Sequence, residues 1–229
     1  MRTTRLDSDE RRKAIVAAAI PLFARKGFAG TTTRELAEAA GISEALLFRH
    51  FPSKQQLYRE ILQLGCEGDP ALEKLATLSA STETLVCMVR FMVRRFVLGC
   101  DAERCEIDTK LRLMLHSCLE DGIYARELFD AVFERVVPYW TASFDAAIAC
   151  GDVAAEVGAP EDQFWFAHHI AAMVAFAALP GQSCVPYAGT PTAIAEQAIG
   201  FILRGLGLSE AAITENNALH PEQALEHLV

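Results

Sequence analysis

Several features of exported and membrane proteins are missing from this sequence. No apolar stretch reaches the roughly 18 uninterrupted residues that a transmembrane helix needs. The amino terminus, Met1 to Arg5, leads into charged residues without an apolar signal segment. We therefore expect a cytoplasmic protein.

The sequence also lacks the cysteine spacing of a metal or redox centre. No Cys-x-x-Cys occurs, and the seven cysteines are scattered along 229 residues. In a cytoplasmic chain of this size they are expected to be reduced, and most of them buried. A zinc or redox site built from Cys100, Cys105 and His116 is the alternative, although its spacing matches no standard ligand set. We expect no metal and no cofactor.

Catalytic signatures are missing as well. The sequence has no phosphate-binding glycine loop, no Gly-x-Ser-x-Gly and no His-Glu-x-x-His. Convincing strand alternation is also lacking, and one helical pattern follows another through the chain. These absences favour an all-α protein that is not an enzyme.

Charge is present but unevenly distributed. Residues 1–64 carry 11 Lys and Arg against 7 Asp and Glu, a net of +4, whereas residues 65–229 carry 10 against 23, a net of −13. A basic head on an acidic body indicates that only the head approaches a polyanion. Ordinary surface variation could also produce this difference.

The stretch TTTRELAEAAGISEALLFRHFPSK, residues 31–54, holds two short helical patterns. Thr32 and Glu35 form a Thr-x-x-Glu capping box at the start of the first, and Gly41 supplies a sharp turn. Ser43 caps the second helix, in which Leu47 and Phe51 point inward. With the helix predicted before it, this pattern is a helix-turn-helix that presents its second helix to a DNA major groove. A purely structural helical hairpin is the alternative.

The same stretch resembles the DNA-binding signature of the TetR/AcrR family of bacterial transcriptional regulators. The resemblance covers roughly residues 9–60. The rest of the chain is similar to the family only in being helical and of suitable length. It implies an N-terminal three-helix helix-turn-helix domain joined to a helical effector-binding and dimerisation domain. Such a protein would be a repressor that a small molecule releases from its operator. Ala45 and Phe48 depart from the residues common in the family, and Phe48 lacks the hydroxyl that usually reaches a phosphate.

Physical roles follow for the residues of this region. Thr32, Thr33 and Lys54 suit phosphate contacts, while the start of the second short helix reaches base edges. Arg34 and Arg49 could read guanine or bind phosphate, or be solvated surface charges. The full set expected to contact DNA is Thr32, Thr33, Arg34, Ser43, Glu44, Ala45, Leu46, Phe48, Arg49, His50 and Lys54.

We expect the DNA-binding domain to occupy residues 1–52, the helical body residues 53–208, and a loosely ordered tail residues 209–229. One recognition helix buries too little surface for specific binding, which favours a homodimer on a palindromic operator. The last two helices of the body are the best candidates for the interface, through Phe166, Ile170, Val174, Ala195 and Ile199. A purely intramolecular core is the alternative.

Methionine and aromatic side chains from several helices of the body suit a flat or apolar small molecule. The candidates are Met88, Met92, Phe96, Met114, Phe133, Trp140, Trp165, His169 and Met173. They could equally fill the core, in which case the protein would bind DNA without responding to an effector.

Overall fold

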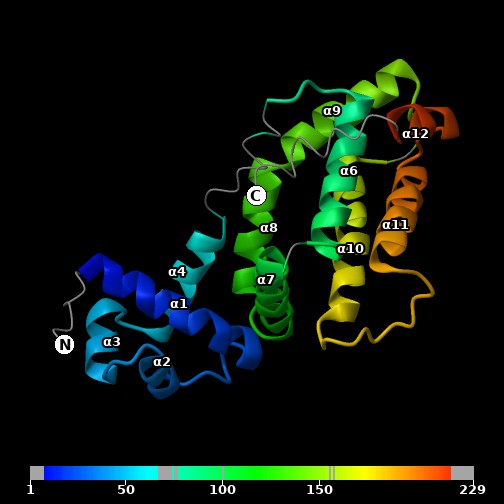
Figure 1. Ribbon diagram of the computed structural model, residues 1–229. Helices are drawn as coiled ribbons and strands as arrows, with labels where there is room; N and C mark the ends of the chain where they lie inside the picture. Colours follow the sequence, from blue (N-terminus) through cyan, green and yellow to red (C-terminus); the bar gives the residue numbers. More distant parts are fainter. Residues whose placement is uncertain are drawn as a thin grey trace. The chain divides into compact units, whose positions relative to one another are not determined.

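The protein is all-α, as the sequence predicts. The computed structural model describes residues 8–66, 74, 77–99, 101–154, 156 and 158–217. Within this part the only β-type pairing is a single bridge between Val153 and Leu208. The helices, shown in Figure 1, are α1 (Ser8–Lys26), α2 (Thr33–Ala39), α3 (Glu44–His50), α4 (Lys54–Cys66), α6 (Thr82–Val97), α7 (Asp101–Leu119), α8 (Ile123–Arg135), α9 (Val137–Cys150), α10 (Pro160–Ala178), α11 (Pro191–Gly205) and α12 (Glu210–Asn217).

Local sequence explains where several helices begin and end. Gly27 follows α1 with a φ of +70°, a conformation in which glycine avoids the steric cost of a side chain. The sequence from residue 122 to 151 predicts one long helix with a kink at Pro138. The structure has two helices instead. Helix α8 ends at Arg135, and Pro138 lies in the first turn of α9, where a proline's missing N–H breaks no helical hydrogen bond.

The chain forms two compact units. The first comprises Met1–Glu67 and Thr109–Asp130, and the second comprises Gly68–Asp108 and Ala131–Val229. The predicted boundary after residue 52 therefore differs from the observed one. Helix α4 belongs to the first unit because Leu57, Tyr58 and Ile61 bury one face of it, and α4 packs on α1.

The second unit is built around α6, which contacts α9, α10, α11 and α12. Figure 1 shows α6, α10 and α11 running side by side. Helix α6 can occupy the centre because most of its length is apolar and buried. The core of the second unit includes Leu85 and Val89 from α6 and the fully buried rings of Trp140 and Phe144 from α9.

The prediction of a loosely ordered tail after Leu208 is wrong for residues 210–217, which form α12. The hydroxyl of Ser209 accepts a hydrogen bond from the N–H of Ala212 and so caps this helix. Ala212 and Ile213 are buried, which is the apolar contact that holds so short a helix in place. Residues 218–229 lie outside the described part of the chain.

Candidate nucleic-acid interface

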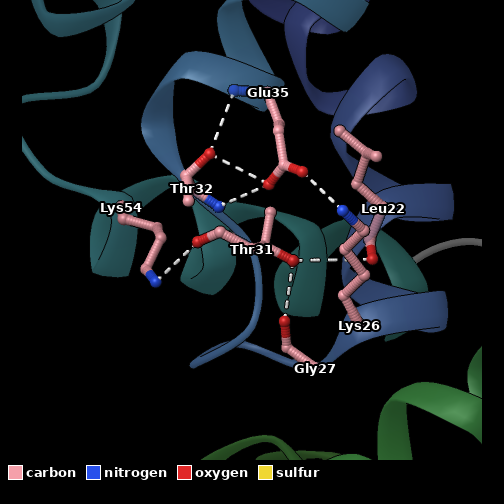
Figure 2. A network of polar contacts seen from close by, with 7 residues as sticks. All are labelled: Leu22, Lys26, Gly27, Thr31, Thr32, Glu35 and Lys54. Carbon is pink, nitrogen blue, oxygen red and sulfur yellow. Dashed lines mark hydrogen bonds and ion pairs between the residues drawn. The ribbon is translucent and has the colours of Figure 1, made fainter.

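The predicted capping box at the start of α2 is confirmed. The hydroxyl of Thr32 accepts from the N–H of Glu35, and the Glu35 carboxylate accepts from the Thr32 N–H at 3.0 Å. Figure 2 shows the two side chains facing each other, with Lys26 of α1 reaching the same carboxylate. The hydrogen bond from Lys26, followed by those from Thr32, lowers the pKa of Glu35 to about 2. Glu35 is therefore ionised at neutral pH and fixes α2 to the end of α1.

The structure argues against phosphate contacts from the two threonine side chains. The Thr32 hydroxyl donates to the Glu35 carboxylate at 2.9 Å, and the Thr33 hydroxyl donates to the Glu44 carboxylate at 2.8 Å. A hydroxyl has one proton to donate, so neither can also donate to a phosphate while these bonds hold. Sequence pattern places both residues correctly but cannot show these partners.

The turn and the second short helix have the predicted geometry. Gly41 has a φ of +65°, and the Ser43 hydroxyl accepts from the N–H of Leu46 at 3.2 Å. Leu47 and Phe51 are buried, as predicted, and anchor α3 in the first unit. The sequence is thus sufficient to define the helix-turn-helix.

Helix α3 carries six of the eleven residues expected to contact DNA. Glu44, Ala45, Phe48 and Arg49 are exposed, whereas Leu46 and His50 are half-buried. Arg34 of α2 is exposed too, and its guanidinium forms an ion pair with Glu38 one turn later, at 2.9 Å. An i,i+4 pair on an exposed helix surface is weak, so Arg34 remains available for DNA.

Lys54 begins α4, as the sequence predicts, but its ammonium binds backbone oxygens of the same unit. Its ammonium donates to the backbone oxygens of Phe28 at 2.7 Å and Thr31 at 2.8 Å, and burial lowers its pKa. The contact with Thr31 is drawn in Figure 2. These two bonds leave one N–H of the ammonium, so the phosphate contact stays a prediction, while the internal bonds are ones that sequence alone cannot reveal.

The sequence pattern does not predict the role of one further residue of this region. The guanidinium of Arg12, on α1, donates to the backbone oxygen of His50 at 2.7 Å and to the Glu60 carboxylate. It also lies 4.2 Å from the ring centre of Phe51. An arginine three residues before a buried Ile15 is a weak signal, since many surface helices begin this way.

In the second unit, the predicted dimer residues divide between a surface of α10 and the core. Phe166 is 61% exposed, and Ile170 and Val174 are half-buried on the same helix. The assignment of Ala195 and Ile199 is wrong, because both are buried in the core of their own subunit. The exposed face of α11 carries Phe201 instead, with a relative exposure of 67%, beside a groove of about 840 Å³.

The predicted ligand residues do not form one set. Met88 and Trp140 are buried in the core of the second unit, and Met92, Phe96 and Trp165 pack against it half-buried. Four others are placed differently from the prediction: Met114 belongs to the first unit, and Phe133, His169 and Met173 are exposed. Met173 lies on the same outer surface of α10 as Phe166, because residues seven positions apart in a helix share one face.

The expectations about membrane helices, metal sites and cysteines can be examined only in the described part of the chain. No helix among them is long and apolar enough to cross a membrane. They contain no cluster of three His, Cys, Asp or Glu suited to a metal ion. Cys100 and the side chain of Cys105 lie outside the described residues, so the alternative metal site is untested. Cys87, Cys118, Cys150 and Cys184 are thiols rather than disulfides.

Residues 15–61 match the sequence profile described as bacterial regulatory proteins, tetR family. The transcriptional repressor KstR2 of Rhodococcus jostii is 30% identical over 136 residues, which are 49% of this chain and 65% of KstR2. The transcriptional activator FasR of Mycolicibacterium smegmatis is 40% identical over 62 residues, 27% of this chain and 28% of FasR. The chain thus spans just under two thirds of one curated relative and about a quarter of the other.

Solved structures match over nearly the whole chain. The protein superposes on NalD, the secondary repressor of the MexAB-OprM multidrug efflux pump in Pseudomonas aeruginosa, with a TM-score of 0.65, 22% identity and coverage of 89% of this chain and 98% of NalD. AibR, solved in complex with isovaleryl coenzyme A and operator DNA, matches with a TM-score of 0.62, 20% identity and coverage of 87% of this chain and all of AibR. At these identities the likeness establishes the fold alone.

Proposed function

Because the chain belongs to the tetR family of bacterial regulatory proteins, we propose that it is a transcriptional regulator that binds operator DNA as a homodimer and responds to a small molecule. The observation that carries the proposal is the capped pair α2 and α3. Its second helix has a buried inner face and an exposed outer face ending in Arg49. A helix held in this way can enter a major groove without losing its packing.

Within that proposal, the base-reading surface is the outer face of α3. Ala45 and the exposed ring of Phe48 are apolar and suit thymine methyl groups, while Arg49 and Arg34 can donate to guanine or phosphate. The test is a titration of labelled DNA from upstream of its own gene, against unrelated duplex of equal length. We expect Arg49→Met to weaken binding of both duplexes, and a wild-type protein with equal affinity for both would contradict the proposal.

The homodimer is supported by the exposed apolar side chains of the last two long helices. Phe166 and Met173 on α10 and Phe201 on α11 are each more than 60% exposed. Water-exposed phenyl and methionine groups on two neighbouring helices are unusual for a monomer and typical of an interface. In a two-fold dimer the same surface of each subunit would meet its copy, which gives a four-helix contact.

The effector part of the proposal rests on the aromatic composition of the second unit. Phe96, Phe164, Trp165 and His168 form successive ring contacts, with centroids 5.0–6.1 Å apart. Burial lowers the pKa of His168 to about 4, so this cluster is uncharged at neutral pH. Such surroundings suit an apolar or aromatic molecule better than an anion.

We propose repression, with release by the effector, as the regulatory mode. Thermal-shift screening of apolar and aromatic compounds would identify a ligand, which is then titrated with and without operator. Linkage requires operator to weaken ligand binding by the factor by which ligand weakens operator binding, about 5- to 150-fold for a coupling of 1–3 kcal/mol. Equal ligand affinity in the two titrations would contradict effector control and leave a constitutive DNA-binding protein. Binding a chromosomal operator would place the protein in the cytoplasm.

A further inference from the structure

Helix α3 contains a single acidic residue, Glu44, and a side chain of α2 holds its carboxylate. Glu44 is the first residue of α3 and is exposed. Helices α2 and α3 lie side by side (Figure 1), and the hydroxyl of Thr33, the first residue of α2, donates to the Glu44 carboxylate at 2.8 Å. A long exposed side chain samples several rotamers when nothing binds it. The bond from Thr33 therefore restricts the carboxylate to a position beside α2.

The charge of Glu44 needs an explanation on a helix that is proposed to enter DNA. Phosphates flank the major groove, so a carboxylate there lowers the affinity for every sequence unless one sequence supplies it with a donor. A cation lies nearby. The pKa of the Arg34 guanidinium is raised, first by its hydrogen bond with Glu38 and also by the charge of Glu44. An acceptor and a donor are therefore close together where α2 meets α3.

From these contacts we propose that Glu44 reads a cytosine in each half-site by accepting a hydrogen bond from its N4 amino group, with Thr33 as the positioning residue. The inference rests on the proposed DNA-binding function and assigns a base to a residue of that surface. A carboxylate has about four acceptor sites, and the bond from Thr33 occupies one of them. Glu44 can thus accept from a base while Thr33 holds it.

The base edges of the major groove favour cytosine as the partner of a carboxylate. Cytosine presents only the N4 amino donor there, and an ionised carboxylate only accepts. Guanine presents the acceptors N7 and O6 and thymine presents O4, all of which repel a carboxylate. Adenine has one donor, but its N7 acceptor lies beside it. The guanidinium of Arg34 suits the acceptors of a guanine, either in the same C·G pair or in a neighbouring pair.

Two substitutions of Glu44 should change the preferred DNA in different ways. The full-length wild type and each variant select sites from a random pool of duplexes, and each base pair of the enriched half-site is then replaced and the duplex titrated. In wild type, replacing the C·G pair read by Glu44 should weaken binding roughly 5- to 150-fold. Glu44→Gln should prefer adenine at that position, because an amide pairs with adenine N6 and N7. Glu44→Ala should bind all four bases there with similar affinity.

Loss of a negative charge also strengthens binding to any DNA, so the experiment needs a control for charge. Asp9 is exposed in the first turn of α1, and Asp9→Asn removes one negative charge from the same unit. It should leave the enriched sequence unchanged.

The positioning role of Thr33 has its own pair of variants. Thr33→Val removes the hydroxyl that holds the carboxylate but leaves every charge in place. It should reduce the preference for cytosine at the Glu44 position without changing the salt dependence of binding. Thr33→Ser retains the hydroxyl and should retain the preference. If Thr33→Val discriminates at that position as wild type does, the positioning role is wrong.

The reading of cytosine is overturned if Glu44→Gln and Glu44→Ala enrich the wild-type half-site and discriminate at every position as wild type does. Their only effect would then be the tighter binding that Asp9→Asn also shows, and Glu44 would be a solvated charge. In that case an inverted repeat enriched by the wild type would still support the proposed function. A wild-type protein that enriches no sequence would contradict the proposed function together with this inference.

Discussion

Glu120 and Ala29 are in contact within the first unit: the backbone N–H of Ala29 lies 3.3 and 3.4 Å from the two oxygens of the Glu120 carboxylate. Glu120 belongs to the turn between α7 and α8, and Ala29 to the loop before α2. Tyr58 of α4 and Tyr124 of α8 add a ring contact at 6.0 Å.

Gly27 gives a direct test of this contact. A Cβ at residue 27 would lie 2.4 Å from a Glu120 oxygen, and its φ of +70° adds a backbone penalty of about 1–2 kcal/mol. Gly41 has a φ of +65° but open space around it, so Gly41→Ala carries the backbone penalty alone. We expect Gly27→Ala to lower the free energy of unfolding, measured in urea, by more than Gly41→Ala does.

The additional loss of unfolding free energy in Gly27→Ala should depend on Glu120. In the Gly27→Ala, Glu120→Ala double variant the closest approach is gone, although the His116 ring would still lie 3.0 Å from the new Cβ. Gly27→Ala should therefore cost less stability in the Glu120→Ala background than in wild type. A double variant in which the two losses simply add would show that the Glu120 carboxylate does not occupy the position described above.

The cap of α2 provides a prediction for stability. Thr32→Ala removes the side-chain acceptor of the Glu35 N–H and one donor to the Glu35 carboxylate. Loss of an N-cap costs about 1 kcal/mol of unfolding free energy. Thr32→Ser keeps the hydroxyl and should retain most of the stability in the same chemical denaturation. Equal losses in the two variants would show that the hydroxyl is not the stabilising group.

The half-buried His168 makes stability depend on pH. Its pKa is about 4 in the folded protein and about 6.5 in an unfolded chain, so between these values only the unfolded chain takes up a proton. Stability contributed by neutral His168 is complete above pH 6.5 and is lost as pH falls toward 4, by about 2 kcal/mol at pH 5. Urea unfolding at pH 7.5 and 5 should show a smaller loss in His168→Gln than in wild type. The exposed neighbour His169 is the control, and equal effects of His168→Gln and His169→Gln would contradict this origin.

A charge on the outer surface of α11 should separate the proposed dimer. Phe201→Glu would place two carboxylates in an apolar contact between subunits, where neither has a partner. Sedimentation velocity should show a shift from dimer to monomer at micromolar concentration. The control is Phe133→Glu on α8, a phenylalanine that is also exposed but lies on a different helix. If Phe201→Glu sediments like wild type, the interface is elsewhere.

Local chemistry explains what the sequence could predict. The caps at Thr32 and Ser43 and the turn at Gly41 each depend on residues within four positions, and all three have the predicted geometry. The same reasoning could have found α12, because Ser209 precedes an acidic and then apolar run. A buried pair as small as Ala212 and Ile213 gives too weak a periodic pattern to be decisive.

Contacts distant in sequence explain what it could not predict. Lys54 has its acceptors 23 and 26 residues earlier in the chain, so its sequence neighbours do not indicate an internal role. Helix α10 is apolar nearly all round, and its buried face runs through Phe164, Ala167 and Ala171. None of these was among the residues predicted to line the dimer interface or the ligand site. When every face of a helix is apolar, periodicity cannot select the one that the partner helices cover.

Selection of preferred sites from a random pool of duplexes is a direct test of sequence-specific binding by a dimer, because it requires neither a known operator nor a known effector. If the protein is a dimeric helix-turn-helix regulator, the enriched DNA should be an inverted repeat. The centres of its half-sites should lie about 10 base pairs, or a multiple of that, apart. The preference for the enriched site over its scrambled version should be about 10³-fold or more. An unenriched pool, or binding that falls with salt equally for all sequences, would contradict the account.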